Sequence, residues 1–160
     1  MQAIDIMRTE LITVSPRDTV DHAARLMLEH RVSGLPVLDD KGLLVGIVSE
    51  GDLLHRVEND TDRSRSMLSE MFASPARLAA EFLKSTGRDV KDVMTPEPIT
   101  VLESTLLADI AELFDRNRIK RVPVLRDGRL IGIVSRTDLL RALVGSGGAR
   151  PGDLRVVEFN

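Results

Sequence analysis

The sequence predicts an α+β fold built from two β-α-β-β-α units with a helical insert between them. Three observations support this class. The chain repeats itself once, each copy carries a stripe of apolar residues at helical spacing, and each copy then has two short β-prone runs joined by a turn. Repeats are considered first because a missed repeat leads to the wrong fold.

The repeat consists of several blocks that occur in the same order in both copies. DIMRTELITV (Asp5–Val14) aligns with DVMTPEPITV (Asp92–Val101), 87 residues later (5 to 92). LLVGIVSEGDLL (Leu43–Leu54) aligns with RLIGIVSRTDLL (Arg129–Leu140), 86 residues later (43 to 129). The change of one residue falls in a predicted turn, where a deletion is tolerated best.

Each copy is predicted to contain an amphipathic helix after a short extended segment, 12–14 in the first copy and 99–101 in the second. Helix N-caps are expected at Asp18 or Thr19, and at Ser104 or Thr105. Apolar residues then fall at positions i, i+3, i+4 and i+7 of one helical face. They are Val20, Ala23, Ala24 and Met27 in the first copy, and Leu107, Ile110, Ala111 and Phe114 in the second.

Two strands and a second helix complete each unit. In the first copy the strands are predicted around Leu35–Leu38 and Leu43–Ser49, joined by an Asp/Gly turn typical of hairpins. The second helix is expected to begin near Gly51 in the first copy and near Thr137 in the second.

The predicted boundaries are 1–57 for the first unit, 58–89 for the insert, 90–144 for the second unit and 145–160 for a flexible tail. Ser74-Pro75 indicates the start of a helix in the insert, and Gly87 its end. A partly mobile insert is the alternative. In the tail, Leu154–Phe159 is a β-prone run that predicts either an added edge strand or the start of a further element.

Composition argues against several classes of function. The formal net charge of −3 gives no global positive field for nucleic acid or anionic lipid. The chain has no Cys, which excludes a thiolate metal site, and no Trp or Tyr, which argues against a stacking platform for single-stranded nucleic acid. The N-terminus MQAIDIMRTE does not resemble a signal peptide. We therefore expect a cytoplasmic protein with neither a nucleic-acid nor a membrane partner.

Known catalytic motifs are not found in the sequence. It has no GxxxxGK[ST], no GxGxxG after a strand, no HExxH and no GxSxG, and the three His are isolated from one another. We predict that the protein is not an enzyme, with no catalytic residue, no metal ligand and no obligatory cofactor.

The repeated block GIVSEGD and GIVSRTD is the candidate binding site. It places Ser49 and Ser135 at strand ends, and Asp52 and Asp138 on the first turn of a helix. Unpaired N–H groups at a helix start attract phosphate, and a carboxylate beside them suits the vicinal diol of a ribose. The same Ser-x-x-Asp pattern is also a capping-box variant that only stabilises the helix. The residues alone leave both interpretations open.

Together these motifs resemble the cystathionine β-synthase (CBS) domain, present twice as a CBS pair or Bateman module of the bacterial stand-alone type. The similarity covers roughly residues 4–57 and 90–144. It implies two units related by a pseudo-two-fold axis and clefts that bind AMP, ADP, ATP or S-adenosylmethionine. It also implies a homodimer.

The resemblance also implies roles for individual residues. Asp52 and Asp138 would hold the ribose hydroxyls, while Ser49 and Ser135 would assist at the ribose or phosphate. The adenine would be read by backbone near two threonines and lined by apolar residues before and within the second strand. These are Thr13, Leu35 and Pro36 in the first copy, and Thr100, Val122 and Pro123 in the second.

One difference between the copies predicts unequal sites. Lys120-Arg121 stands where the first copy has Ser33-Gly34, and basic groups favour a phosphorylated ligand through charge-assisted bonds. Three further candidates for such contacts are Arg31, Arg118 and Arg136.

The predicted function is a regulatory module that senses an adenosine-containing nucleotide in clefts between its two CBS units. The nucleotide would act as a regulatory ligand that shifts the population of conformations. The identity of the regulated partner is left open. The alternative is an oligomerisation or protein-interaction scaffold without bound nucleotide.

Overall fold

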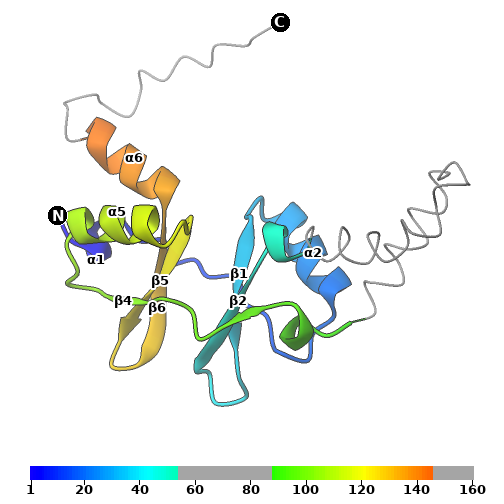
Figure 1. Ribbon diagram of the computed structural model, residues 1–160. Coiled ribbons are helices and arrows are strands. Elements are labelled where there is room, and N and C mark those ends of the chain that lie inside the picture. Colours follow the sequence, from blue (N-terminus) through cyan, green and yellow to red (C-terminus); the bar gives the residue numbers. More distant parts are fainter. Residues whose placement is uncertain (54–87, 146–160) are drawn as a thin grey trace, which may run out of the picture. The chain divides into compact units, whose positions relative to one another are not determined.

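The computed structural model of the chain describes residues 1–53 and 88–145. The chain divides into two compact bodies. We call residues 12–98 the continuous body, and residues 1–11 together with residues 99 onward the discontinuous body. Both contain helices and a three-stranded sheet, so the predicted α+β class is confirmed (Figure 1).

In the continuous body, α2 and the helical residues 50–53 lie on one side of the sheet (Figure 1). The strand order is β1-β2-β3, and both pairings are antiparallel. Its elements are α2 (Val20–Glu29), β1 (Gly34–Leu38), β2 (Leu44–Ser49), the 3₁₀ turn η1 (Val90–Asp92) and β3 (Thr95–Pro96). The buried core consists of Val14, Ala23, Met27, Leu35, Val37, Val48 and Val90.

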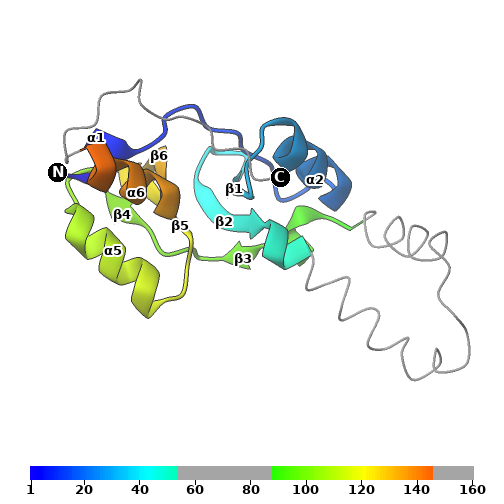
Figure 2. The same cartoon turned by 90° about the horizontal axis from the view of Figure 1, so that it is seen from above.

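In the discontinuous body, the helices gather on one side of the sheet (Figure 1, Figure 2). The strand order is β4-β5-β6, with β4 parallel to β5 and β5 antiparallel to β6. Its elements are α1 (Ala3–Ile6), β4 (Val101–Leu102), α5 (Leu107–Arg116), β5 (Arg121–Arg126), β6 (Arg129–Ser135) and α6 (Arg136–Gly145). The buried core consists of Ala3, Val101, Ile110, Phe114, Val122, Val124 and Val134.

The two amphipathic helices form where the apolar stripes predict them, but only one begins at a predicted cap. Thr19 caps α2, because its Oγ1 accepts a hydrogen bond from the N–H of His22 at 3.1 Å. The expected cap of α5 at Ser104 or Thr105 is wrong, since the N-cap is Leu106. The Thr105 hydroxyl instead accepts the N–H of Leu102 at 3.1 Å, in the turn before the helix. Ala24 is half-buried and Ala111 exposed, so neither belongs to the fully buried core.

The two hairpin turns explain the one-residue change in the repeat spacing. In the β5–β6 turn, Asp127 and Gly128 both have positive φ, 50° and 76°, as a two-residue type I′ turn requires. The β1–β2 turn is longer. Asp39 closes it by accepting the N–H groups of Lys41 and Leu43 on its Oδ1, at 2.9 and 2.8 Å.

The segment that precedes each copy in the sequence packs on the other copy. Met7 lies against Gly132 of β6, where an added Cβ would come within 2.5 Å of the methionine sulfur. Met94 lies against Gly46 of β2 in the same way, with the corresponding distance 2.6 Å. The first eleven residues therefore belong with the second copy. As a result, Arg8, the residue after Met7, pairs with β6, and Thr95, the residue after Met94, pairs with β2.

Several predictions fall outside the described residues. They are the helical insert up to residue 87 with its expected start at Ser74-Pro75 and its end at Gly87, the tail from residue 146, and the edge strand at Leu154–Phe159. Within residues 1–53 and 88–145, no helix has the length and apolar character needed to cross a membrane.

Candidate functional site

Both copies place a serine at the end of a strand and an aspartate on the first turn of the following helix, as predicted. Ser49 is the last residue of β2, and residues 50–53 are helical. Ser135 is the last residue of β6, and α6 begins at Arg136. Asp52 and Asp138 are therefore carried on helices whose starts are fixed by the adjoining strands.

One oxygen of each aspartate closes a capping box. Ser135 donates both its N–H and its hydroxyl to Oδ2 of Asp138, at 2.8 and 2.6 Å, and Asp138 donates its N–H back to the serine Oγ at 3.3 Å. Ser49 and Asp52 repeat this arrangement at 2.7, 2.9 and 3.3 Å. The capping role is therefore present in both copies. Any ligand must use the second carboxylate oxygen.

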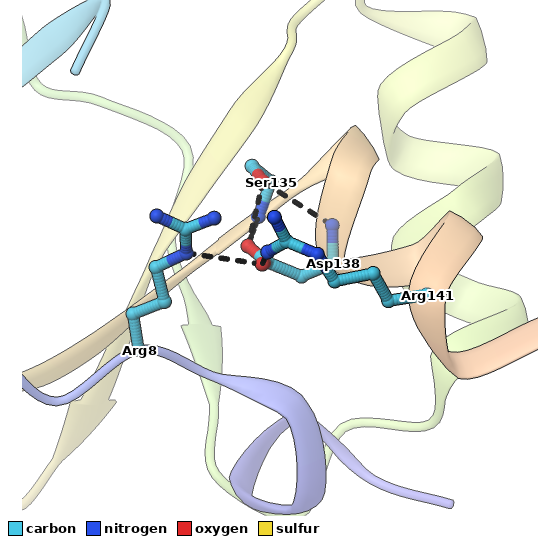
Figure 3. Close-up of polar contacts among 4 residues, drawn as sticks. All are labelled: Arg8, Ser135, Asp138 and Arg141. Atoms are coloured by element: carbon cyan, nitrogen blue, oxygen red, sulfur yellow. Dashed lines mark hydrogen bonds and ion pairs between the residues drawn. The ribbon is translucent and has the colours of Figure 1, made fainter. Parts of the chain in front are cut away.

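The second oxygen of Asp138 is held by two arginines (Figure 3). Arg8 donates from Nε to Oδ1 at 3.1 Å, and Arg141 donates from Nη1 to the same oxygen at 3.2 Å. Arg8 arrives from the segment after α1, whereas Arg141 lies three residues further along α6. The Asp138 side chain is only 5% exposed. It is thus a nearly buried carboxylate in contact with two cations.

This environment changes the acidity of Asp138. Burial raises the pKa of its carboxyl, since it penalises the charged form. The hydrogen bonds from the hydroxyl and N–H of Ser135, and the hydrogen bond and positive charge of Arg8, favour the charged form. These effects outweigh burial, and the pKa of Asp138 lies below its usual value.

The second oxygen of Asp52 has a different neighbour. Thr95 approaches Oδ1 through its hydroxyl at 3.5 Å, the outer limit of a hydrogen bond. Thr95 follows Met94 as Arg8 follows Met7, so these two residues occupy matching positions in the two bodies. Asp52 is half-buried, and within residues 1–53 and 88–145 no ion pair reaches it.

The basic pair predicted to recognise phosphate lies beside the second of these sites. Arg121 is the register partner of Ser135 across β5 and β6, and the carbonyl of Lys120 accepts the N–H of Arg136 at 3.0 Å. In the continuous body, Gly34 pairs with Ser49 in the same register. The difference between the copies therefore appears at the same end of each sheet as the aspartate.

The three further arginine candidates have other surroundings. Arg136 turns its guanidinium to carbonyls at the end of α5, with Nε on Ile119 at 3.1 Å and Nη2 on Phe114 at 3.1 Å. Arg31 and Arg118 follow the ends of α2 and α5 with positive φ of 52° and 53°. Arg31 also lines a cavity of 530 Å³ together with Ala24, Met27, Leu28, Val32, Ser33, Glu50 and Leu53. That cavity lies next to the Ser49–Asp52 pair but includes neither residue.

The remaining predicted residues divide between the two bodies. Leu35 and Val122 are core residues, and Pro36 and Pro123 are fully buried next to them in β1 and β5. Thr13 directly precedes Val14, which bridges to Val37, and Thr100 directly precedes Val101 of β4; they are half-buried and exposed respectively. The structure brings Thr13, Leu35, Pro36, Ser49 and Asp52 into the continuous body, and Thr100, Lys120, Arg121, Val122, Pro123, Ser135 and Asp138 into the discontinuous body.

Three residues that contact the aspartates were missed by sequence reasoning: Arg8, Thr95 and Arg141. The repeat register carried a signal for two of them, because Arg8 and Thr95 align directly after the matching methionines. Arg141 stands three residues after Asp138, on the same helix face. In the described part of the chain, no group of three or more acidic or histidine side chains could hold a metal ion.

Comparison with known proteins gives consistent matches along the chain. The family pattern described as "CBS domain" matches residues 3–59 and 90–145. CBS domain-containing protein CBSX2 of Arabidopsis thaliana, a chloroplastic protein, is 40% identical over 144 residues, which cover 84% of this chain and 59% of CBSX2. The uncharacterised protein MJ1426 of Methanocaldococcus jannaschii is 34% identical over 151 residues, 88% of this chain and 89% of its own. The chain thus spans about three fifths of CBSX2.

A solved structure shows the same architecture. The crystal structure of CBSX2 in complex with AMP aligns with a TM-score of 0.70 and 36% identity, over 91% of this chain and 98% of that chain. At 36% identity the two chains are similar in sequence as well as in fold.

Proposed function

Because the chain belongs to the CBS-domain family, we propose that it is a regulatory module that binds an adenosine-containing nucleotide at a Ser-x-x-Asp site. The observation that carries the proposal is the Asp52 carboxylate. One of its oxygens closes the helix cap. Among the described residues, the other oxygen accepts only the long hydrogen bond from the Thr95 hydroxyl. CBSX2, which is 36% identical to this chain over the aligned structure, has been crystallised in complex with AMP.

The chemistry of the site suits a ribose. A carboxylate accepts hydrogen bonds on about four lone-pair positions, so one that uses one oxygen for capping can still accept from a vicinal diol. The Ser hydroxyl and the helix start are adjacent, and both favour a phosphate or a sugar oxygen.

Regulation follows from differential binding. A ligand that binds one arrangement of the chain more tightly than another shifts the population toward it, by no more than the difference in affinity. We propose that the chain transmits this shift to a partner without catalysing a reaction. A homodimer fits the exposed apolar side chains on α6, Leu140 and Val144, which are 61% and 60% exposed. A cytoplasmic location stays a prediction from the sequence.

Titration calorimetry with AMP, ADP, ATP and S-adenosylmethionine tests the proposal. We expect saturable binding of at least one of the four ligands, and a loss of affinity of about tenfold or more in the Asp52→Ala/Asp138→Ala double variant, because charged hydrogen bonds to the diol disappear. Calorimetry suits a protein without Trp or Tyr. Folded protein, free of co-purified nucleotide, that gives no heat with any of the four would contradict the proposal and favour the scaffold alternative.

A further inference from the structure

We infer that the two aspartate sites of one chain are unequal: Asp52 accepts the diol of the ligand, whereas Arg8 closes the site at Asp138. The difference arises at one pair of matching positions, where one body has Arg8 and the other has Thr95. The inference rests on the proposed function and adds to it which site is open and which residue controls the other.

Counting hydrogen-bond acceptors gives the first argument. A carboxylate has two oxygens and about four lone-pair positions. At Asp138 all are used, since Oδ2 accepts the N–H and hydroxyl of Ser135 and Oδ1 accepts Arg8 and Arg141. A diol can bind there only by displacing one of these donors.

The donors on Oδ1 of Asp138 are hard to displace because they carry charge. Hydrogen bonds between ionised groups are roughly twice as strong as those between neutral groups. The Asp138 carboxylate is 5% exposed, so water would poorly replace the hydrogen bonds of a displaced arginine. A neutral diol offers weaker donors than the guanidinium it would replace. The site at Asp138 is therefore closed to it.

The situation at Asp52 is the reverse. Thr95 is a neutral donor at 3.5 Å, a distance at which a hydrogen bond contributes little. A ribose hydroxyl at ordinary distance would replace it with a stronger bond. Ser49 meanwhile keeps the other oxygen at 2.7 and 2.9 Å and so holds the carboxylate in position.

Arg8 controls the closed site because its backbone is fixed. Arg8 and Ile133 exchange two backbone hydrogen bonds, at 2.9 and 3.0 Å, and Met7 packs on Gly132. The guanidinium is thus delivered to Asp138 from a point 130 residues away in sequence. Arg141 reaches the same oxygen from α6 with a side chain that is 65% exposed, compared with 50% for Arg8. Arg8 is a positioning residue that acts through Asp138.

Exchanging the two residues tests the inference. AMP is titrated calorimetrically into the full chain, the Arg8→Thr and Thr95→Arg variants, and the variant with both changes. We expect one tight site per unaltered chain, abolished by Asp52→Asn. Arg8→Thr should add a second site or strengthen a weak one by about tenfold, and Thr95→Arg should weaken the first by about tenfold. In the exchanged variant, binding should become insensitive to Asp52→Asn.

A matched control and the opposite outcomes make the test decisive. Arg25→Thr removes an arginine that pairs with Asp21 on the exposed surface of α2, and should leave both stoichiometry and affinity unchanged. Circular dichroism checks that each variant is folded. Two equal sites in the unaltered chain, or an Arg8→Thr variant identical to it, would overturn the inference while leaving the proposed function standing. No binding of AMP to any folded variant would overturn this inference, and the proposed function falls only if none of the four ligands tested above binds.

Discussion

Replacing Asp138 by alanine is expected to lower the free energy of unfolding by about 2–4 kcal/mol at neutral pH. The change removes the partner of Arg8, of Arg141 and of the Ser135 cap at once. The side chain it removes is only 5% exposed, so water compensates poorly for the lost bonds. Urea unfolding followed by circular dichroism measures the difference.

The matched change in the other body is the control. Asp52→Ala removes the same capping box but no ion pair among the described residues, so it should cost only about 1 kcal/mol, the usual contribution of a helix cap. Equal losses for the two variants would show that Arg8 and Arg141 add nothing to the stability of the chain.

The pH dependence of this difference has a defined sign. The folded-state pKa of Asp138 lies below its usual value, so the contribution of the carboxylate is fully present above the unfolded pKa of about 4. It is lost as the pH falls through the lower folded pKa. The stability difference between the unaltered chain and Asp138→Ala should therefore stay constant from neutral pH down to about pH 5, and narrow only below about pH 4. A difference that changes between pH 6 and 8 would point to another group.

Phe114→Ala is expected to destabilise the chain by about 3–5 kcal/mol. Phe114 is 2% exposed and packs in the core of the discontinuous body, so its removal leaves a cavity in addition to the lost transfer energy. The repeat places Met27 at the matching position of the continuous body, 6% exposed. Met27→Ala should cost less, about 2–4 kcal/mol, because methionine is flexible and fills its site less rigidly.

Leu28→Ala is the control for these core variants. Leu28 is adjacent to Met27 on α2 but 80% exposed, so its removal should change the stability by less than about 1 kcal/mol. The same urea unfolding experiment serves all three variants. A loss at Leu28 as large as at Phe114 would contradict the assignment of the core.

Much of the fold follows from local patterns in the sequence. The apolar stripes predict α2 and α5 because a helix brings positions i, i+3, i+4 and i+7 to one face. Asp-Gly at 127–128 predicts the β5–β6 turn because positive φ is easiest there. The repeat also brings Ser-x-x-Asp to the same place in both bodies, and the structure resolves its local role as a helix cap.

The contacts that distinguish the two sites do not follow from local patterns. Nothing in residues 1–11 alone indicates which copy they pack on, because both copies have a glycine, Gly46 or Gly132, that a methionine packs against. The contact of Arg8 with Asp138 depends in turn on that choice. The cap of α5 was mispredicted for a related reason, since the Thr105 hydroxyl can satisfy either a turn or a helix start and local sequence does not decide between them.

Equilibrium dialysis of the unaltered, nucleotide-free chain against AMP and 2′,3′-dideoxy-AMP tests the central claim most directly. The two ligands share base and phosphate and differ in the diol that the Asp52 carboxylate is proposed to accept. We predict saturable binding of AMP, and binding of the dideoxy analogue that is weaker by about tenfold or more, as the loss of hydrogen bonds to a charged group requires. Equal affinity for the two ligands would contradict the claim that this carboxylate reads a ribose, and no saturable binding of AMP would contradict AMP as the ligand of this site.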